Sequence, residues 1–323
     1  MEIAPRIHRI DGIVGTRPLQ LYFLWGDVRT VLLDTGCAPD PERLIFPYLR
    51  ELGLGPTDVD LVINTHPDLD HCGGNHAMKQ SHPRLQISCG EADRPLIEDP
   101  QTMWDRRYNA YADRHGLKYD DNGRKWIFEM LGKSQPVDWT WRGGETLRLG
   151  DDWVVEIHHT PGHSAGHLSL FDPRSRTMLG GDAVQGSVYL DVDGTPALCP
   201  TYLDVDTYLA TVQYLESLPI ERLAICHWPL KTGLEVRNFL SETRQFVEMA
   251  DRVLLEELRR QNQALGLAEL IPLAGPKLGA WPRSVDAELM YALAGNMDRL
   301  MANGKVVQRD GKPVRYEAIA DQI

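Results

Sequence analysis

The chain has 323 residues, of which 42% are hydrophobic and 25% charged, as in a globular protein with one large and one smaller domain. Its formal net charge of −12 argues against broad binding to nucleic acid or to an anionic membrane, because both surfaces are negatively charged. No apolar run approaches the ~18 residues that cross a membrane, and the N-terminus does not resemble a secretion signal. The five cysteines are scattered and form no Cys-x-x-Cys pair, which indicates reduced thiols. The sequence therefore predicts a cytoplasmic protein.

The first part of the chain has the pattern of an α/β domain. Residues 19–25 and 28–34 are strand-like and are separated by Gly26-Asp27, a hairpin signal. Residues 41–52 predict a helix, and the apolar run 59–64 predicts a buried strand. Sites on α/β folds tend to be built where strands end, so we expect functional side chains on the loop that follows this run.

That loop, residues 65–71, holds four candidate metal ligands within six residues: His66, Asp68, Asp70 and His71. Imidazoles mixed with carboxylates are the ligand set expected for zinc, iron or manganese. The alternative is that these residues are ordinary turn formers and helix caps, which is the usual role of an isolated Asp or His in a loop.

Three further candidates stand at the ends of later predicted strands. His163 lies in Thr-Pro-Gly-His-Ser after the alternating stretch 153–157, Asp182 follows residues 177–181, and His227 follows residues 223–226. Repeated placement at strand ends argues against chance, so we expect all seven side chains to meet at one edge of the fold.

As a set and in this order, these motifs resemble the metallo-β-lactamase superfamily, whose pattern is His-x-His-x-Asp-His, a distant Thr-Pro-Gly-His, an Asp after a strand and a final His. The turn containing Asp34 is similar to an early Asp-x-Gly turn of the same family. The resemblance covers roughly residues 5–240 and implies an α/β fold, the αββα sandwich. The pattern of the remaining residues predicts a C-terminal, mainly helical module. We place the boundary between a catalytic domain 1–238 and a module 239–323.

The resemblance implies two neighbouring metal sites. The first would be formed by His66, Asp68 and His163. The second would be formed by Asp70, His71 and His227, with Asp182 bridging the two metals. Asp70 and Asp182 are the residues expected to act in catalysis.

Asp68 departs from the family pattern, which has a second His at this position. A set of two imidazoles and one carboxylate suits zinc, but it is also the facial triad of non-haem iron enzymes. We therefore expect two divalent metal ions, with zinc as the catalytic ion and with iron or manganese competing better than at an all-His site.

Residues 91–140 form a long insertion that is rich in aromatic side chains and is expected to be helical. It could be an accessory layer packed on the body, or a wall over the metal cleft, as long non-repetitive insertions often are. On the second interpretation, Trp104 and Tyr108 would contact the substrate. Arg106, Arg107 and Arg114 are expected to be solvated, with substrate binding as the alternative.

The C-terminal module begins with helical spacing over residues 239–263. Residues 264–281 are expected to be looser because Pro and Gly interrupt them, a helix is expected over 285–302, and residues 304–316 predict a hairpin that turns at Asp310-Gly311. The arrangement resembles a winged helix. With 11 Lys and Arg against 12 Asp and Glu, the module has a weak footprint for nucleic acid, so lining the pocket or forming a homodimer is favoured.

The ligand set predicts a hydrolase in which a hydroxide bridging the metals attacks an ester, thioester or lactone of a small molecule. A phosphodiesterase or ribonuclease is the alternative, favoured only by the winged-helix resemblance. A di-iron redox protein is a second alternative, favoured by Asp68, although no flavin-binding segment is evident. Among nearby residues, His158 is expected to be structural, His159 and His167 are candidates for proton transfer, and Cys226 is expected to be a packing residue.

Overall fold

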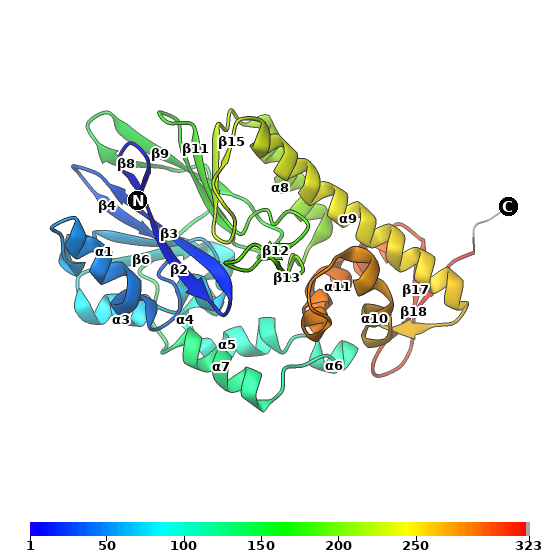
Figure 1. The fold of residues 1–323 in the computed structure, drawn as a ribbon. Coiled ribbons are helices and arrows are strands. Elements are labelled where there is room, and N and C mark those ends of the chain that lie inside the picture. Colours follow the sequence, from blue (N-terminus) through cyan, green and yellow to red (C-terminus); the bar gives the residue numbers. More distant parts are fainter. Residues whose placement is uncertain (321–323) are drawn as a thin grey trace.

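The structure is a computed structural model, and it describes residues 1–320. Two sheets lie face to face, and helices cover both outer faces (Figure 1). The first sheet has the strand order β1-β2-β3-β4-β5-β6-β7, with bounds Glu2–Ala4, Ile7–Val14, Arg17–Trp25, Thr30–Leu33, Leu61–Asn64, Gln86–Gly90 and Trp139–Trp141. The second has the order β15-β14-β11-β10-β9-β8, with bounds Lys231–Thr232, Arg222–Ile225, Thr177–Gly181, Leu168–Asp172, Trp153–His159 and Thr146–Gly150.

Side-chain alternation explains how the sheets pack. On β9, Trp153, Val155 and Ile157 point into the space between the sheets, whereas Val154 is exposed. They meet apolar side chains of the first sheet, such as Leu33 on β4, in one buried cluster. The strands β4, β5 and β6 are parallel and buried on both faces, which explains their nearly continuous apolar sequences.

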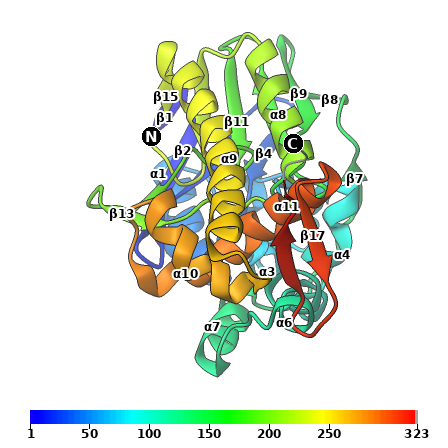
Figure 2. The same cartoon turned by 90° about the vertical axis from the view of Figure 1, so that its right-hand side faces the viewer.

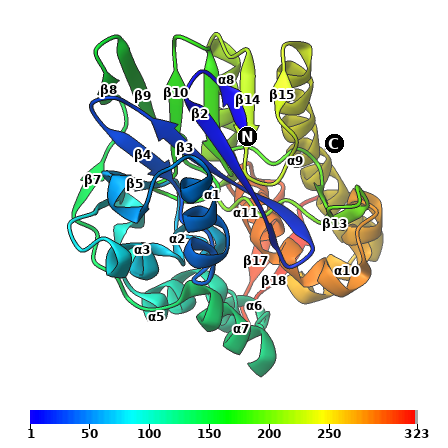
Figure 3. The same ribbon diagram turned by 60° about the vertical axis from the view of Figure 1, so that its left-hand side comes forward.

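Helices cover the outer face of each sheet (Figure 3). Beside the first sheet lie α1 (Phe46–Glu51), α2 (Leu69–Cys72) and α3 (Asn75–Ser81), with short turns of helix at Pro41–Ile45 and Pro56–Asp58. The second sheet is covered by α8 (Val205–Ser217) and the long α9 (Leu234–Gln261), which face the viewer in Figure 2. This is the αββα arrangement expected from the sequence, and the fold prediction is confirmed.

The insertion is helical and runs beneath the sheets to the C-terminal part of the chain (Figure 1). It contains a turn at Glu91–Asp93, α4 (Arg94–Glu98), α5 (Pro100–Met103), a π-helical turn at Trp104–Tyr108, α6 (Ala112–His115) and α7 (Asp121–Leu131). Arg114 joins it to the C-terminal residues, because its guanidinium pairs with Asp298 at 2.9 Å and its carbonyl accepts the N–H of Val314 at 2.9 Å.

After α9 come α10 (Leu267–Leu278), a 3-10 turn (Arg283–Glu288) and α11 (Leu289–Ala302). A small sheet has the order β16-β18-β17, with bounds Leu265–Gly266, Arg315–Ala318 and Val306–Arg309, and a separate hairpin joins β12 (Tyr189–Leu190) to β13 (Pro196–Leu198). The hairpin predicted at Asp310-Gly311 is therefore present as β17–β18. Within residues 1–320, no helix combines the length and apolar character needed to cross a membrane.

The prediction of a loose segment over 264–281 is wrong, because α10 occupies most of it. Pro272 and Pro276 lie inside this helix, where each removes a backbone hydrogen bond at a cost of about 3 kcal/mol. The helix persists because its apolar face, including Leu270, Ile271 and Ala274, is buried against α9 and α11. Tertiary packing here outweighs local propensity.

The two neighbouring valines of β9 test the inter-sheet core. Val155→Ala should lower the free energy of unfolding by about 2 kcal/mol, because it opens a cavity at a site with no exposed surface. Val154→Ala makes the same chemical change on the opposite face, at a side chain that is 40% exposed, and should cost less than about 0.5 kcal/mol. Chemical denaturation of both variants measures the difference. Equal losses would contradict the packing described here.

Candidate metal centre

The loop that carries the first four candidates is shaped by Asp34, which follows β4. Asp34 is buried, and its carboxylate accepts hydrogen bonds from Thr65 N (2.7 Å), Thr65 Oγ1 (2.8 Å) and His71 Nδ1 (2.8 Å). The strands β4 and β5 are parallel neighbours, so their carboxyl ends lie at the same edge of the sheet. Asp34 therefore ties the start and the end of loop 65–71 to that edge.

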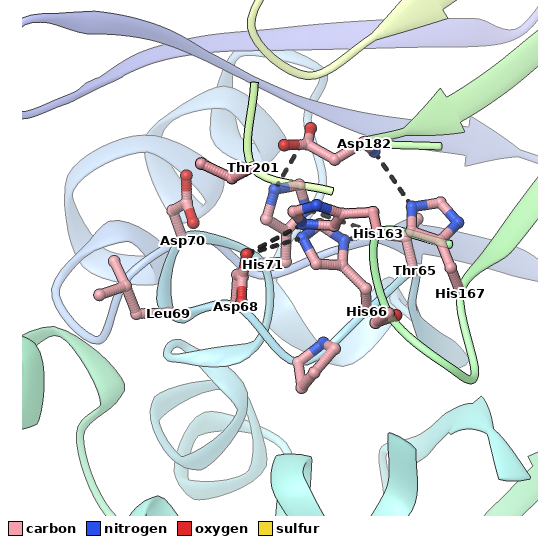
Figure 4. A network of polar contacts seen from close by, with 12 residues as sticks. Thr65, His66, Asp68, Leu69, Asp70, His71, His163, His167, Asp182 and Thr201 are labelled. Carbon is pink, nitrogen blue, oxygen red and sulfur yellow. Dashed lines mark hydrogen bonds and ion pairs between the residues drawn. The ribbon is translucent and has the colours of Figure 1, made fainter. Parts of the chain in front are cut away.

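All seven candidate residues lie in one region. Figure 4 shows His66, Asp68, Asp70, His71, His163 and Asp182 gathered there, and His227 lies next to Asp70. The first cluster contains His66, Asp68 and His163, in which Asp68 Oδ2 lies 3.0 Å from His163 Nε2 and 3.6 Å from His66 Nε2. Donor atoms bound to one tetrahedral zinc ion at about 2.0–2.1 Å are roughly 3.3 Å from each other. These separations suit a single metal ion.

The second cluster contains His71, Asp182 and His227, together with Cys226. Asp182 Oδ1 is 3.8 Å from His71 Nε2, and Asp182 Oδ2 is 3.6 Å from His227 Nε2. Asp70 joins this cluster through His227, because its Oδ2 lies 3.3 Å from His227 Nε2. His66 and His163 thus lie in one cluster and His71 and His227 lie in the other, which is the grouping that the family pattern implies. The structure also adds the buried thiol of Cys226, which the sequence indicated only as packing.

Unpartnered polar atoms show that these residues fit a cation. His66 Nε2, His71 Nε2 and Asp182 Oδ1 are buried and have no hydrogen-bond partner in the described chain. A buried nitrogen or carboxylate oxygen without a partner costs about 1–3 kcal/mol or more, so such atoms are rare unless a ligand engages them. Here three of them face one small region and share the donor chemistry of zinc, iron or manganese.

The opposite ring nitrogen of each second-cluster histidine is held by an acceptor. His71 donates from Nδ1 to Asp34, and His227 donates from Nδ1 to the carbonyl of Pro18 at 2.7 Å. Both rings are thereby kept as the tautomer whose Nε2 has a free lone pair, as in metal-binding histidines generally.

The loop of His163 is fixed by close packing and by a buried acid. Gly162 has φ of +129°, and a Cβ there would lie 2.4 Å from Cα of Tyr208, so only glycine lets the loop approach α8 this closely. Burial raises the pKa of Asp93, whose carboxylate accepts hydrogen bonds from the Ser164 hydroxyl and the Gly166 N–H. Both contacts hold the segment that carries His163.

Of the three neighbouring histidines, only His167 reaches the centre. Its Nε2 accepts the N–H of Asp182 at 3.1 Å, and its ring stacks on that of His66 with centroids 5.1 Å apart. Burial holds its pKa well below the usual value. His158 forms hydrogen bonds with Tyr214 and Glu156, which agrees with the structural role expected for it. His159 is exposed and forms a hydrogen bond with the carbonyl of Ala165.

The expectation that Arg107 is solvated is wrong, because the residue contacts the first cluster in a way that the sequence did not indicate. It is buried and forms a bidentate ion pair with Asp68, at 2.6 Å (Nε to Oδ1) and 2.7 Å (Nη2 to Oδ2). Its Nη1 also donates to the carbonyl of His163 at 2.9 Å. Burial alone would raise the pKa of Asp68, but the guanidinium of Arg107 and the hydrogen bond with His163 hold it well below its usual range.

A cavity with a volume of about 270 Å³ opens onto the candidate ligands Asp68, Asp70, Asp182 and His227. The insertion lines it with Tyr108, Tyr119, Trp126 and Ile127, and the C-terminal part lines it with Val285, Glu288 and Tyr291. The insertion is thus a wall of the cavity. Trp104 does not line it and instead packs on Phe128 and Tyr119, so the expected substrate contact of this residue is wrong.

Residues 15–227 match the family model described as "Metallo-beta-lactamase superfamily". This chain belongs to that superfamily. The match spans well over half of the sequence and includes all seven candidate ligands, as well as Asp34 and Arg107.

Curated relatives from the superfamily align with about half of the chain. Hydroxyacylglutathione hydrolase GloC of Haemophilus influenzae is 29% identical over 168 residues, which are 51% of this chain and 66% of that protein. Acyl-coenzyme A thioesterase MBLAC2 of Gallus gallus is 26% identical over 209 residues, 61% of this chain and 66% of that protein. A probable metallo-hydrolase of Methanocaldococcus jannaschii is 34% identical over 162 residues, 50% of this chain and 56% of that protein. The chain therefore spans less than two thirds of the length of each relative.

Solved structures of the superfamily share the fold over nearly the whole chain. A metallo-beta-lactamase family protein from Thermus thermophilus has a TM-score of 0.77 at 20% identity, covering 98% of this chain and all of its own. A beta-lactamase domain protein from Burkholderia ambifaria has a TM-score of 0.74 at 17% identity, covering 99% of this chain and 93% of its own. At such identities the likeness establishes the fold alone.

The pair Arg107–Asp68 can be tested against its neighbour Arg106, which is exposed. In the metal-free protein, Arg107→Met should lower the free energy of unfolding by about 3–5 kcal/mol, because a buried carboxylate loses its counter-charge. Added zinc should recover more stability in this variant than in the parent protein, since the cation then neutralises Asp68. Thermal unfolding with and without zinc measures both effects.

Arg106→Met is the matched control and should leave stability within about 0.5 kcal/mol of the parent value. If Arg107→Met were as stable as Arg106→Met without metal, the ion pair would not have the role assigned to it.

Proposed function

We propose that the protein is a dinuclear metal-dependent hydrolase that acts on an ester, thioester or lactone bond of a small molecule. The observation that carries this proposal is the meeting of two His/carboxylate clusters at the end of one cavity. Relatives named as a hydroxyacylglutathione hydrolase and an acyl-coenzyme A thioesterase support the ester-type bond.

In this proposal, His66, Asp68 and His163 would hold one metal ion, while Asp70, His71 and His227 would hold the other. Asp182 would bridge the two ions, and Cys226 would stay a packing residue beside the second one. Zinc is the proposed ion, with iron or manganese competing at the first position because Asp68 is a hard oxygen ligand there. Arg107 supports this assignment, since it offsets the extra negative charge that Asp68 brings.

Two divalent ions held there would polarise the scissile carbonyl and make hydroxide available near neutral pH. The residues of the chain then have separate roles. Asp70 and Asp182 would offset the charge of the ions, and Asp182 also accepts a hydrogen bond from Tyr189 at 3.0 Å. His167 fixes the backbone at Asp182, so the carboxylate is held before the substrate arrives.

The cavity supports a small substrate. Its walls combine apolar side chains such as Leu69, Ile127 and Trp126 with many polar ones, which suits a small compound that has both an apolar and a polar part. Because Glu288 and Tyr291 complete the wall, we propose that the module 239–323 serves to close the pocket of the domain 1–238.

The first test of the function is metal analysis paired with a panel of thioesters, esters, lactones and phosphodiesters. The purified protein should contain about two divalent ions per chain and should turn over an ester-type compound. Turnover of phosphodiesters alone would instead support the phosphodiesterase alternative.

Removal of a carboxylate at the centre should affect metal content and turnover together. Asp182→Ala should reduce the metal content from two ions per chain to about one, and should lower kcat by at least about 100-fold, because the second cluster loses an anionic ligand. The exposed Asp113, replaced in the same way, is the control. Full metal content with unchanged kcat in Asp182→Ala would rule out the proposed role.

The aromatic wall should affect substrate binding without affecting metal content. Trp126 lines the cavity and is 41% exposed, so Trp126→Ala should raise KM several-fold for the best substrate by removing apolar contact area. Tyr214 on α8 is also 41% exposed but lies outside the cavity, so Tyr214→Ala should leave KM unchanged. Identical KM values in both variants would exclude a substrate contact at Trp126.

A further inference from the structure

Arg17 presents a guanidinium to the cavity without a partner of its own. It is the first residue of β3 and lines the cavity that opens onto the candidate ligands. Its Nε is buried and unpartnered, and no hydrogen bond or ion pair joins its side chain to any residue among 1–320. Buried polar atoms are normally satisfied, so an unsatisfied arginine nitrogen in a pocket wall indicates that a ligand supplies the acceptor.

The backbone around Arg17 is held firmly beside the centre. The next residue, Pro18, accepts the Nδ1–H of His227 through its carbonyl. The preceding residue, Thr16, bonds the β12–β13 hairpin through its carbonyl, which accepts Val192 N–H at 3.1 Å, and through its hydroxyl, which donates to Asp191. The backbone that carries Arg17 is therefore held in place beside the proposed metals.

Apart from the candidate metal ligands, the other polar side chains of the cavity wall are already engaged. Arg107 is paired with Asp68, and the Tyr108 hydroxyl accepts the N–H of Leu69 at 3.2 Å. The Tyr119 hydroxyl donates to Glu288 at 2.9 Å and contacts the hydroxyl of Tyr291 at 2.9 Å. The hydroxyl of Tyr189 donates to Asp182. Of the two arginines that line the cavity within residues 1–320, Arg17 is therefore the one free to bind an incoming group.

We propose that Arg17 is a specificity residue that binds an anionic group, a carboxylate or a phosphate, at the end of the substrate remote from the bond that is cleaved. The substrate class is thus an ester-type compound whose acyl or alcohol part bears a second, negatively charged end. This proposal rests on the proposed function of the same site. A guanidinium suits this role because it binds planar carboxylate and phosphate groups with two parallel hydrogen bonds.

Glu288 offers a competing explanation for Arg17. Burial raises the pKa of Glu288, whereas the positive charge of Arg17 lowers it. The two side chains therefore interact electrostatically. However, they form no ion pair within 4 Å, and Glu288 already accepts a hydrogen bond from Tyr119. If Arg17 served only to offset the charge of Glu288, its guanidinium would not need to be free. Binding of an anionic ligand does need a free guanidinium.

Equilibrium binding to the metal-loaded, full-length protein separates these explanations. Isothermal titration compares dicarboxylates of three to six carbons with the monocarboxylate of the same chain length, so that one end of each ligand can meet the metals. At least one dicarboxylate should bind about 10-fold or more tightly than its counterpart, because a charge-assisted bidentate contact has this strength. A parallel series of ω-phosphonocarboxylates shows whether phosphate or carboxylate is the preferred anion.

Arg17→Gln should bring the affinity ratio close to one, and Arg17→Lys should keep part of it. Arg84→Gln is the matched control, since Arg84 is exposed and does not line the cavity, and it should leave the ratio unchanged. The double variant Arg17→Gln/Glu288→Gln should not recover the ratio. The proposal is overturned if no pair of ligands shows a preference, if Arg17→Gln keeps the preference, or if the double variant restores it.

Kinetics distinguish this inference from the proposed function itself. For a thioester with a terminal carboxylate, Arg17→Gln should raise KM about 10-fold, while kcat/KM for the uncharged thioester of equal length stays unchanged. If no ester-type compound is turned over but the binding preference depends on Arg17, the proposed reaction fails and the anion site stands. If both thioesters are turned over with the same loss in Arg17→Gln, the reaction stands and the anion site fails.

Discussion

The carboxylate of Asp34 is the constraint on which the centre depends. The residue is buried with a positive φ of 65°, and its side chain accepts three hydrogen bonds that fix both ends of loop 65–71. A buried carboxylate is costly unless its oxygens are satisfied. The same bonds that stabilise Asp34 orient Thr65 and His71. The geometry of the loop is thus a consequence of how two parallel strands end, and the ligands need little further ordering when a cation binds.

The amino-acid sequence predicts those features of the fold and the site that depend on local pattern and strand order alone. The alternation on β9 and the apolar run of β5 predicted buried strands, and the position of His163, Asp182 and His227 after strands predicted that they would meet. Parallel neighbours place their carboxyl ends at one edge, so this inference needs no side-chain detail. The family pattern then grouped the residues into two sets.

The predictions that were wrong concern contacts between segments that are distant in sequence. The solvation expected for Arg107 was wrong because no local sequence pattern indicates that this residue is buried. The folding of the insertion over loop 65–71 brings it to Asp68. An extra carboxylate at position 68 was a clue, since a buried acid needs a counter-charge. In the same way, α10 contradicts its prolines because packing against α9 and α11 is invisible to local propensity. The predicted substrate contact of Trp104 was wrong because aromatic content does not reveal which side of a helix faces a cavity.

The cavity wall is assembled largely from parts of the chain that carry none of the seven candidate ligands. The hairpin β2–β3, the insertion and the residues after Pro282 contribute to it, and the insertion is tied to the C-terminal part through Arg114 and Tyr119. The candidate ligands and most of the cavity wall therefore lie in different stretches of sequence, which the ion pair of Arg107 with Asp68 connects. On the proposed function, substitutions at wall positions other than Arg107 would change which molecules are accepted while the ligand shell stays intact, so a lineage built on this scaffold would acquire new substrates without losing its metal centre.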